Sequence, residues 1–253
     1  MRLVDTHCHL YMDAFPDPEP VVEEARAAGV DRMIVVGIDQ ATCVQAIQLA
    51  ERFEGVYAII GHHPNNAAKF SPDDLKWIED LLAHPKAVAL GEIGLDYHWD
   101  NATKEQQFAS LGAQLDLGVR LGKPIVFHCR EAYSDLLDFL QAAPKHPHLI
   151  HCFGGTLPDA RRAVELGIWF GVDGPVTYKK SIELREIVAE LPGDRIVLET
   201  DSPYLSPEPF RGKTNSPARI PYINRMVAAC RGISEEACAE LTTQNAQCFF
   251  GLI

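Results

Sequence analysis

The sequence contains no long apolar segment. No run of about 18 apolar residues occurs in it, which is the length that a membrane-spanning helix needs. The N-terminal stretch MRLVDTHCHL also lacks the apolar core of a signal peptide. These absences argue against membrane insertion and secretion, so we expect a cytoplasmic protein with no membrane partner.

Patterned cysteines and an excess of basic residues are also missing. The seven cysteines form no CxxC pair and no repeated framework, which argues for reduced thiols and against disulfides or a thiolate zinc site. The 23 Lys and Arg residues are outnumbered by 35 Asp and Glu residues, and the formal net charge is −12. This charge disfavours an extended grip on a nucleic-acid duplex, although it leaves room for a local cationic pocket.

Eight short apolar runs rich in strand-forming residues recur along the chain, with helical patterns between them. The runs are LVDTH, RMIVVGI, VYAIIGH, AVALGEIG, PIVFHC, HLIHCF, IWFGV and RIVLETD. Continuous apolar strands that alternate with helices are typical of a parallel sheet covered on both faces. Eight such units in roughly 250 residues predict an α/β fold, a TIM-like (β/α)8 barrel, as a single domain over residues 1–253. A doubly wound open sheet is the alternative.

The clearest helical pattern covers residues 103–121. Thr103 and Gln106 form a capping box at its start. Ser71, followed by a proline, predicts the start of another helix in the same manner. The stretch Ser234–Phe250 predicts an additional helix at the C-terminus.

His7 and His9 stand two residues apart at the end of the first predicted strand. Residues i and i+2 of a strand share a face, so both imidazoles can point into the barrel while Cys8 points away from it. Two neutral imidazoles on one side suit a divalent metal. An isolated HxH is more often a hydrogen-bonded pair of strand histidines, so the interpretation depends on the neighbouring strands.

Polar side chains also stand at the ends of five other predicted strands. They are His62, His63, Glu92, His128, His151, Glu199 and Asp201. The carboxyl ends of barrel strands build the active site, so we expect these groups to converge with the two N-terminal histidines and favour a metal centre. Glu92 can bridge two cations or pair with Arg130, and these roles are compatible. Asp201 can bind a metal and accept a proton from the attacking water, or cap the following turn; Glu199 can support the structure or orient a ligand.

The chain resembles the TatD-like metal-dependent hydrolases, a branch of the amidohydrolase superfamily. The motifs that carry the resemblance run almost from end to end: VDTHCHL, GHHP, GEIGLDYH, PIVFHCREA, HCFGG, GPVTYKK, LETDSPYLSPEP and RGKTNSPA. The resemblance implies a TIM-like barrel, two divalent metals and a hydrolase whose best-known members are deoxyribonucleases. It places His7, His9 and Asp201 on one metal, His128 and His151 on the other, and Glu92 between them.

Two positions depart from the pattern of this family. His62 stands where relatives usually carry an aliphatic residue, and Asp173 stands where a small hydroxyl side chain is expected. A carboxylate at Asp173 near the site would repel a phosphate, which weakens the prediction of a nucleic-acid substrate. The metal ligands that the resemblance implies are unaffected.

We predict a metal-dependent deoxyribonuclease that acts as a 3′–5′ exonuclease on single-stranded DNA or strand ends, through a water that two cations activate. A concave barrel mouth admits a strand end more readily than an intact duplex. Zinc or manganese suits the imidazole and carboxylate donors, and magnesium is the alternative. The predicted catalytic residues are Asp201 and Glu92. The predicted substrate contacts are His63, Arg130, Tyr204, Arg211 and Lys213.

Two other functions compete with this prediction. A metal-dependent hydrolase of an ester or amide, such as an aminoacyl ester on transfer RNA, would use the same metals. Many superfamily relatives of that kind carry a modified lysine where this chain has Glu92, which disfavours cleavage of cyclic amides. A metal-stabilised nucleic-acid-binding protein without turnover is the third hypothesis, but a structural metal site normally closes its coordination. No obligate protein partner is indicated.

Overall fold

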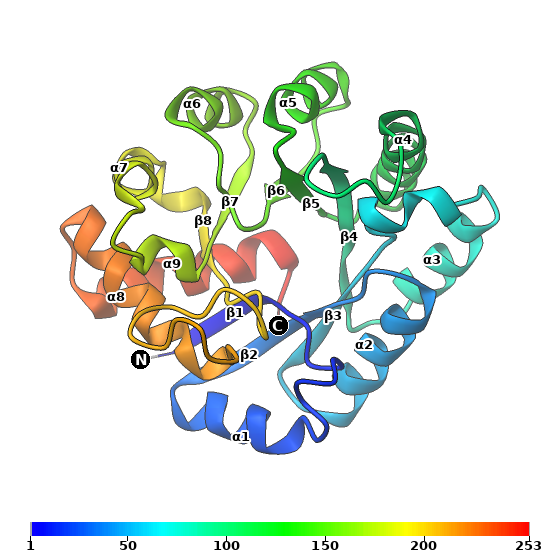
Figure 1. Cartoon of the computed structure of the whole chain (residues 1–253). Coiled ribbons are helices and arrows are strands. Elements are labelled where there is room, and N and C mark those ends of the chain that lie inside the picture. Colours follow the sequence, from blue (N-terminus) through cyan, green and yellow to red (C-terminus); the bar gives the residue numbers. More distant parts are fainter. Residues whose placement is uncertain (1, 253) are drawn as a thin grey trace.

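The computed structural model describes residues 2–252, which contain eight parallel strands joined by helices (Figure 1). The strands are β1 (Leu3–Cys8), β2 (Val30–Val36), β3 (Val56–Ile60), β4 (Ala87–Asp96), β5 (Ile125–Arg130), β6 (His148–Ile150), β7 (Trp169–Val172) and β8 (Ile196–Leu198). They pair in chain order, and a parallel bridge between Cys8 and Ser202 joins β1 to the segment after β8. The sheet is therefore a nearly closed barrel, and the TIM-like fold is confirmed.

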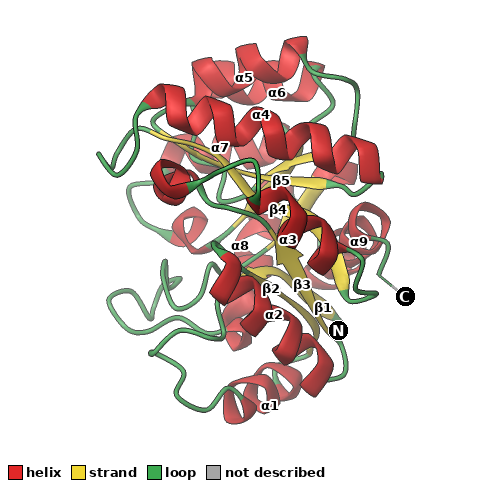
Figure 2. Ribbon diagram, turned by 90° about the vertical axis from the view of Figure 1, so that its right-hand side faces the viewer, coloured by secondary structure: helices red, strands yellow, loops and turns green. Residues whose placement is uncertain are grey.

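Helices form a shell around the strands, as the side view in Figure 2 shows. They are α1 (Glu19–Ala27), α2 (Gln40–Arg52), α3 (Asp74–Leu82), α4 (Lys104–Leu121), α5 (Tyr133–Ala142), α6 (Leu157–Glu165), α7 (Ile182–Glu190), α8 (Ile220–Arg231) and α9 (Glu235–Phe250). Within the described residues, none of these helices combines the length and the apolar character that crossing a membrane requires.

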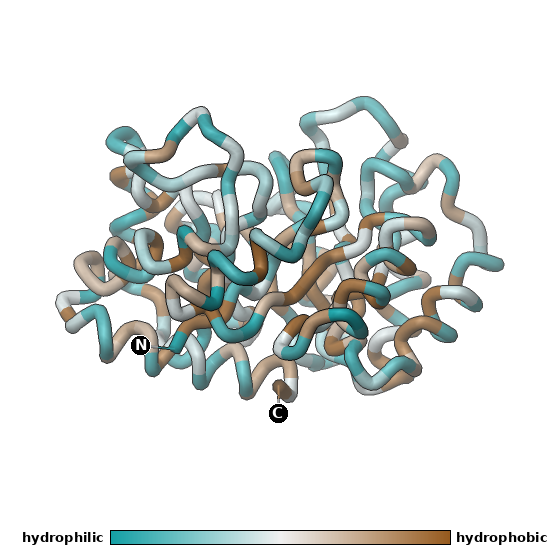
Figure 3. The backbone as a smooth tube through the Cα atoms, turned by 90° about the horizontal axis from the view of Figure 1, so that it is seen from below, coloured by the Kyte–Doolittle hydropathy of each residue, from teal (hydrophilic) through white to brown (hydrophobic). Residues whose placement is uncertain are grey.

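Alternate strand residues pack into two separate apolar clusters. In β5, Ile125 and Phe127 belong to the larger cluster between barrel and helices, whereas Val126 belongs to a smaller one to which residues of several strands contribute. Helix α9 adds Phe249 and Phe250 to this smaller cluster. Figure 3 shows hydrophobic stretches through the middle of the molecule and hydrophilic loops at its edge. The apolar residues of the strands come before the polar ones, so the polar groups gather at the carboxyl end.

Helix α4 begins where the sequence predicts and also anchors two strand ends. Thr103 Oγ1 accepts a hydrogen bond from the Gln106 backbone N–H, and Gln106 Oε1 accepts one from the Thr103 N–H, which confirms the capping box. Further along, the buried amide of Gln107 bonds both the N–H and the carbonyl of Asp96, and that of Gln114 does the same for His62. These two clamps hold the ends of β3 and β4 against the helix.

Helix α3 begins later than Ser71, the residue at which the sequence predicts its start. Its first residue is Asp74, and the carboxylate of Asp74 accepts a hydrogen bond from the Ser71 backbone N–H at 2.7 Å. The predicted serine cap is therefore not formed, and Ser71 instead precedes the helix and bonds to the side chain of its first residue. Helix α9 begins after Ser234, whose hydroxyl accepts from the Ala237 N–H, as predicted.

Gly94 lies where β4 passes close to β5. Its φ is +145°, and a Cβ built there would overlap the carbonyl oxygen of His128. Gly94→Ala should therefore lower the free energy of unfolding by at least about 1–3 kcal/mol, measured by urea denaturation. The matched control is Gly112→Ala in α4, where the nearest atom is Phe139 Cζ at 4.0 Å. Helix propensity should make that variant up to about 1 kcal/mol more stable. Equal stability of the two variants would contradict the close approach of Gly94 to the His128 carbonyl oxygen.

Candidate metal centre

The carboxyl end of the barrel brings together the six residues predicted to bind metal. They are His7 of β1, His9 just after β1, Glu92 of β4, His128 of β5, His151 directly after β6 and Asp201 after β8. Among the described residues, three sets place their ligand atoms within 4.8 Å of one another: His7, His9 and Asp201; His7, Glu92 and His151; and His63, Glu92 and His128. The first two sets share a histidine and the last two share a carboxylate, so they form one continuous centre.

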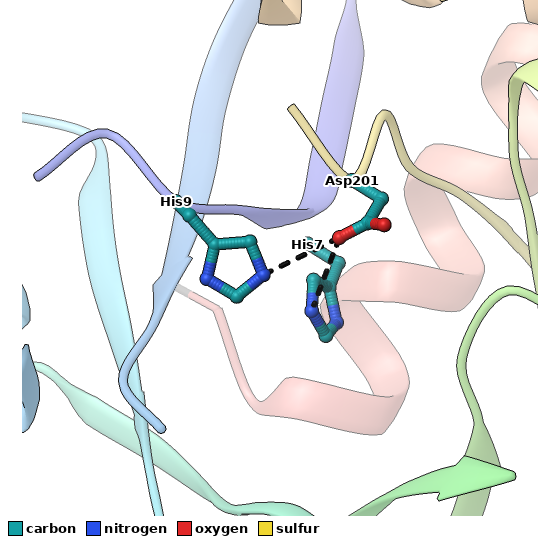
Figure 4. A group of neighbouring side chains, drawn as sticks. All are labelled: His7, His9 and Asp201. Carbon is teal, nitrogen blue, oxygen red and sulfur yellow. Dashed lines mark ion pairs between the residues drawn. The ribbon is translucent and has the colours of Figure 1, made fainter. Parts of the chain in front are cut away.

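The first set is built on the HxH pair (Figure 4). Asp201 Oδ1 lies 3.3 Å from His9 Nε2 and 3.9 Å from His7 Nε2. The backbone of Asp201 is left-handed, with a φ of +51°, a conformation that aspartate tolerates better than most residues. His9 Nδ1 lies 2.9 Å from the Val36 carbonyl and donates to it, so Nε2 is the ring nitrogen that faces Asp201. Burial alone would raise the pKa of Asp201, but the hydrogen bond and charge of His9 lower it below its usual value.

Glu92 is the hub of the centre. Its Oε1 lies 2.5 Å from His151 Nε2 and 2.8 Å from His128 Nδ1, and its Oε2 lies 3.4 Å from His7 Nε2. Burial alone would raise the pKa of this carboxyl group, but the surrounding imidazoles, His151 above all, hold it well below the usual range. Among the described residues, its ion pairs are with histidines, so the alternative pairing with Arg130 is not formed.

The buried groups fit a metal that satisfies them. Both ring nitrogens of His7 are buried without a hydrogen-bond partner among the described residues, although the ring stacks on His151 with centroids 4.0 Å apart. An unsatisfied buried polar atom normally costs free energy, so orphaned nitrogens beside carboxylates call for a ligand. Imidazole nitrogen and carboxylate oxygen are donors that divalent transition metals bind well. The residues present therefore fit a metal-binding role.

Two of the predicted ligand histidines lie beside further carboxylates. Asp96 Oδ2 lies 2.9 Å from His128 Nε2, which leaves Nδ1, on the Glu92 side, as the ligand atom. Glu199 Oε1 accepts a hydrogen bond from the Cys152 backbone N–H at 2.5 Å and lies 3.5 Å from His151 Nδ1. Carboxylates in this position fix the orientation of a metal-ligating imidazole. The sequence allowed two roles for Glu199, structural support or orientation of a ligand. Its contacts with the Cys152 backbone and with the His151 ring are compatible with both roles.

Asp5 and Asp96 are the residues that sequence reasoning missed. Asp5 accepts hydrogen bonds from the backbone N–H groups of His7 and Thr200 and from the Thr200 hydroxyl, which joins the first strand to the segment carrying Asp201. Asp5 interrupts an apolar strand, and Asp96 is the last residue of one. A buried acid is costly unless it is paired, so these positions were a signal that could have found the two aspartates.

The two departures from the family pattern are not among the residues that the structure groups as possible metal ligands. The His62 ring contacts the Asn66 carbonyl at 3.1 Å and packs edge-on against Phe70, so it belongs to the surrounding helices. Asp173 is buried, and its Oδ2 has no hydrogen-bond partner among the described residues. Burial and the neighbouring Glu199 raise the pKa of Asp173 well above its usual value, which weakens the phosphate repulsion expected of it.

A cavity of about 530 Å³ opens over the centre. Of the predicted substrate contacts, His63, Arg130 and Tyr204 line it, and His63 Nε2 lies 3.6 Å from Glu92 Oε1. Arg211 and Lys213 are not among the lining residues. The guanidinium of Arg211 instead lies 4.5 Å from the centre of the Tyr178 ring. A volume of this size is typical of small-molecule sites, and it suits one or two nucleotides rather than a duplex.

Comparisons of this chain with a family model, with known proteins and with solved structures all indicate the same family. The family model described as "TatD related DNase" matches residues 4–251. A Bacillus subtilis protein named "Uncharacterized metal-dependent hydrolase YabD" is 39% identical over 98% of this chain and 98% of its own length. A Klebsiella pneumoniae protein named "3'-5' ssDNA/RNA exonuclease TatD" is 34% identical over 93% of this chain and 92% of its own. The crystal structure of YJJV, a TatD homologue from Escherichia coli K12, superposes with a TM-score of 0.94 at 32% identity, covering 100% of this chain and 99% of that one.

Proposed function

The chain belongs to the TatD related DNase family of metal-dependent hydrolases that act on ester bonds, and on that basis we propose that it is a 3′–5′ exonuclease on single-stranded DNA or strand ends. The observation that carries the proposal is a buried carboxylate, Glu92, within ion-pairing distance of four imidazoles directly beneath an open cavity. We further propose that residues 1–253 form one hydrolase domain located in the cytoplasm.

We propose that the centre holds two divalent cations, zinc or manganese, with magnesium as the alternative. His7, His9 and Asp201 would hold one, His128 and His151 the other, and Glu92 would contact both. When bound, such a pair of cations acidifies water and offsets charge on phosphoryl oxygens. The arrangement of the imidazoles is maintained by the chain itself, through the Val36 carbonyl and the carboxylates of Asp96 and Glu199.

Asp201 is the group that we propose to accept the proton from the attacking water. Its side chain is 15% exposed, so it reaches the cavity, and the lowered pKa keeps it ionised near neutral pH. The neighbouring His9 is already held through Nδ1 and stabilises the carboxylate through Nε2. A fixed, ionised carboxylate within reach of the substrate has the features of a general base.

The cavity walls supply the proposed substrate contacts. Arg130 offers a guanidinium that matches a phosphate, His63 faces the leaving group, and Tyr204, half-exposed at the rim, offers a ring for stacking. Arg211 and Lys213 would contact more distant phosphates. Because the net charge is −12, few phosphates would be neutralised, and we expect modest affinity that falls only gently with added salt.

The test is a substrate panel with the metal-loaded protein. A 5′-labelled single-stranded oligodeoxynucleotide should give a ladder of products shortened from the 3′ end, whereas the blunt duplex should react much more slowly. The matched RNA and a carboxyl ester are assayed in parallel. Preference for the ester would replace the exonuclease with an esterase acting at the same centre. Tight binding of the oligonucleotide without any turnover would support the non-catalytic alternative.

A further inference from the structure

Trp99 is an exposed aromatic residue at the rim of the cavity. It lies in the loop between β4 and α4, is 51% exposed and lines the cavity over the metal centre. An indole ring normally buries a large apolar area, so leaving half of it in water gives up free energy of folding. Because Trp99 lines the cavity, its exposed ring is available to a molecule bound there.

The loop that carries this ring is tied to the predicted metal centre through Asp96. Asp96 Oδ1 accepts hydrogen bonds from the backbone N–H groups of His98, at 2.9 Å, and Trp99, at 3.3 Å. The other oxygen of the same carboxylate lies 2.9 Å from His128 Nε2. One buried carboxylate therefore fixes both a predicted metal ligand and the start of the loop that carries the indole.

The surroundings of the ring match one nucleotide. His98 packs edge-on against Trp99, with centroids 4.8 Å apart and ring planes at 87°, and is itself held by Glu131 at 2.9 Å. The Arg130 guanidinium lies 5.9 Å from the centre of the indole ring. An aromatic face next to a guanidinium offers stacking for a base and a charged hydrogen-bond donor for a phosphate.

The barrel topology separates Trp99 from the other exposed aromatic residue of the cavity. Trp99 follows β4 and Tyr204 follows β8, and strands four apart in a nearly closed ring of eight lie across the barrel from each other. Both rings line the same cavity, with the predicted metal ligands also in its wall. A phosphodiester at the centre thus has an aromatic surface available on either side.

We propose that Trp99 is a nucleobase-stacking subsite that binds one of the nucleosides flanking the scissile phosphate, with Arg130 on the adjoining phosphate. The proposal rests on the exonuclease function proposed above and goes beyond it by assigning substrate recognition to a residue outside the predicted contacts. Because every base has an aromatic face, this subsite selects unpaired bases without selecting their sequence.

The kinetic test compares two substrates, one with bases and one without bases at the reacting end. For a single-stranded oligodeoxythymidylate, Trp99→Ala should raise KM roughly 5- to 150-fold, the effect of losing one stacked base, with kcat much less affected. Trp99→Phe should restore most of the affinity. On an oligonucleotide with abasic residues at the reacting end, wild type and Trp99→Ala should behave alike. The control is Ile182→Ala, which removes an exposed apolar side chain on α7. It should leave the KM for both substrates unchanged.

Two outcomes overturn the proposal. An unchanged KM for the thymidylate shows that the base does not contact the ring, and an equal loss on both substrates shows that the ring only supports the loop.

A binding test distinguishes a failure of the proposed subsite from a failure of the proposed exonuclease function. The chain has three tryptophans, so a Trp77→Phe/Trp169→Phe variant reports on Trp99 alone. A phosphorothioate oligothymidylate should quench its fluorescence, and the abasic version should not. Quenching without turnover of ordinary DNA by the wild type would retain the subsite and reject the exonuclease. Turnover without quenching would reject the subsite alone.

Discussion

Glu92→Gln should lower kcat for phosphodiester hydrolysis by more than about 100-fold. Substitutions of residues that only orient metal ligands commonly cost about 10- to 100-fold, and Glu92 is proposed to contact both cations directly. The amide has nearly the same shape but no negative charge, so it cannot offset the imidazoles that lie 2.5–3.6 Å from the carboxylate. The effect should therefore appear in kcat and in the metal content of the purified protein.

The matched control for this variant is Glu79→Gln. Glu79 pairs with Arg120 on the outer surface, and exposed pairs of this kind contribute little to stability. The control should keep full activity and both metals, which shows that removing one carboxylate charge is not itself the cause. Retained hydrolysis in Glu92→Gln, with its fold verified by circular dichroism, would reject the bridging role.

Chelation should abolish hydrolysis and lower the free energy of unfolding. At a free metal concentration 100 times the dissociation constant, a single ion that binds only the folded chain adds about 2.7 kcal/mol. The structural reason is the set of buried polar groups that the metal would satisfy, above all the orphaned ring nitrogens of His7. The measurement is urea unfolding of the chelated protein before and after addition of zinc or manganese, with metal content determined in parallel.

Two histidine variants check that this stabilisation arises at the centre. His7→Ala should reduce both the metal content and the gain in stability. His84→Ala, which removes a surface imidazole paired with Glu51, should leave both unchanged. If saturating metal stabilised the chelated wild type no more than it stabilised His7→Ala, the centre would not be a metal site.

The sequence by itself was sufficient for the fold and for the expectation that polar residues at the strand ends come together. Eight apolar strand patterns separated by helical ones allow few architectures, because a parallel sheet needs a crossover between successive strands. A barrel then places every strand end at one mouth, so polar residues as far apart as His7 and Asp201 could be predicted to meet. The capping box at Thr103 was equally readable, because its two partners are three residues apart.

Only the tertiary structure showed which groups hold that centre in position. Asp5 bonds Thr200, 195 residues away, and the amides of Gln107 and Gln114 clamp the ends of two strands. The exposure of Trp99 and its link to the metal centre through Asp96 were also beyond prediction. Local periodicity reports which face of an element is buried, whereas hydrogen-bond partners and exposure depend on what packs against that face. Those neighbours come from distant segments, and their positions are decided only when the barrel closes.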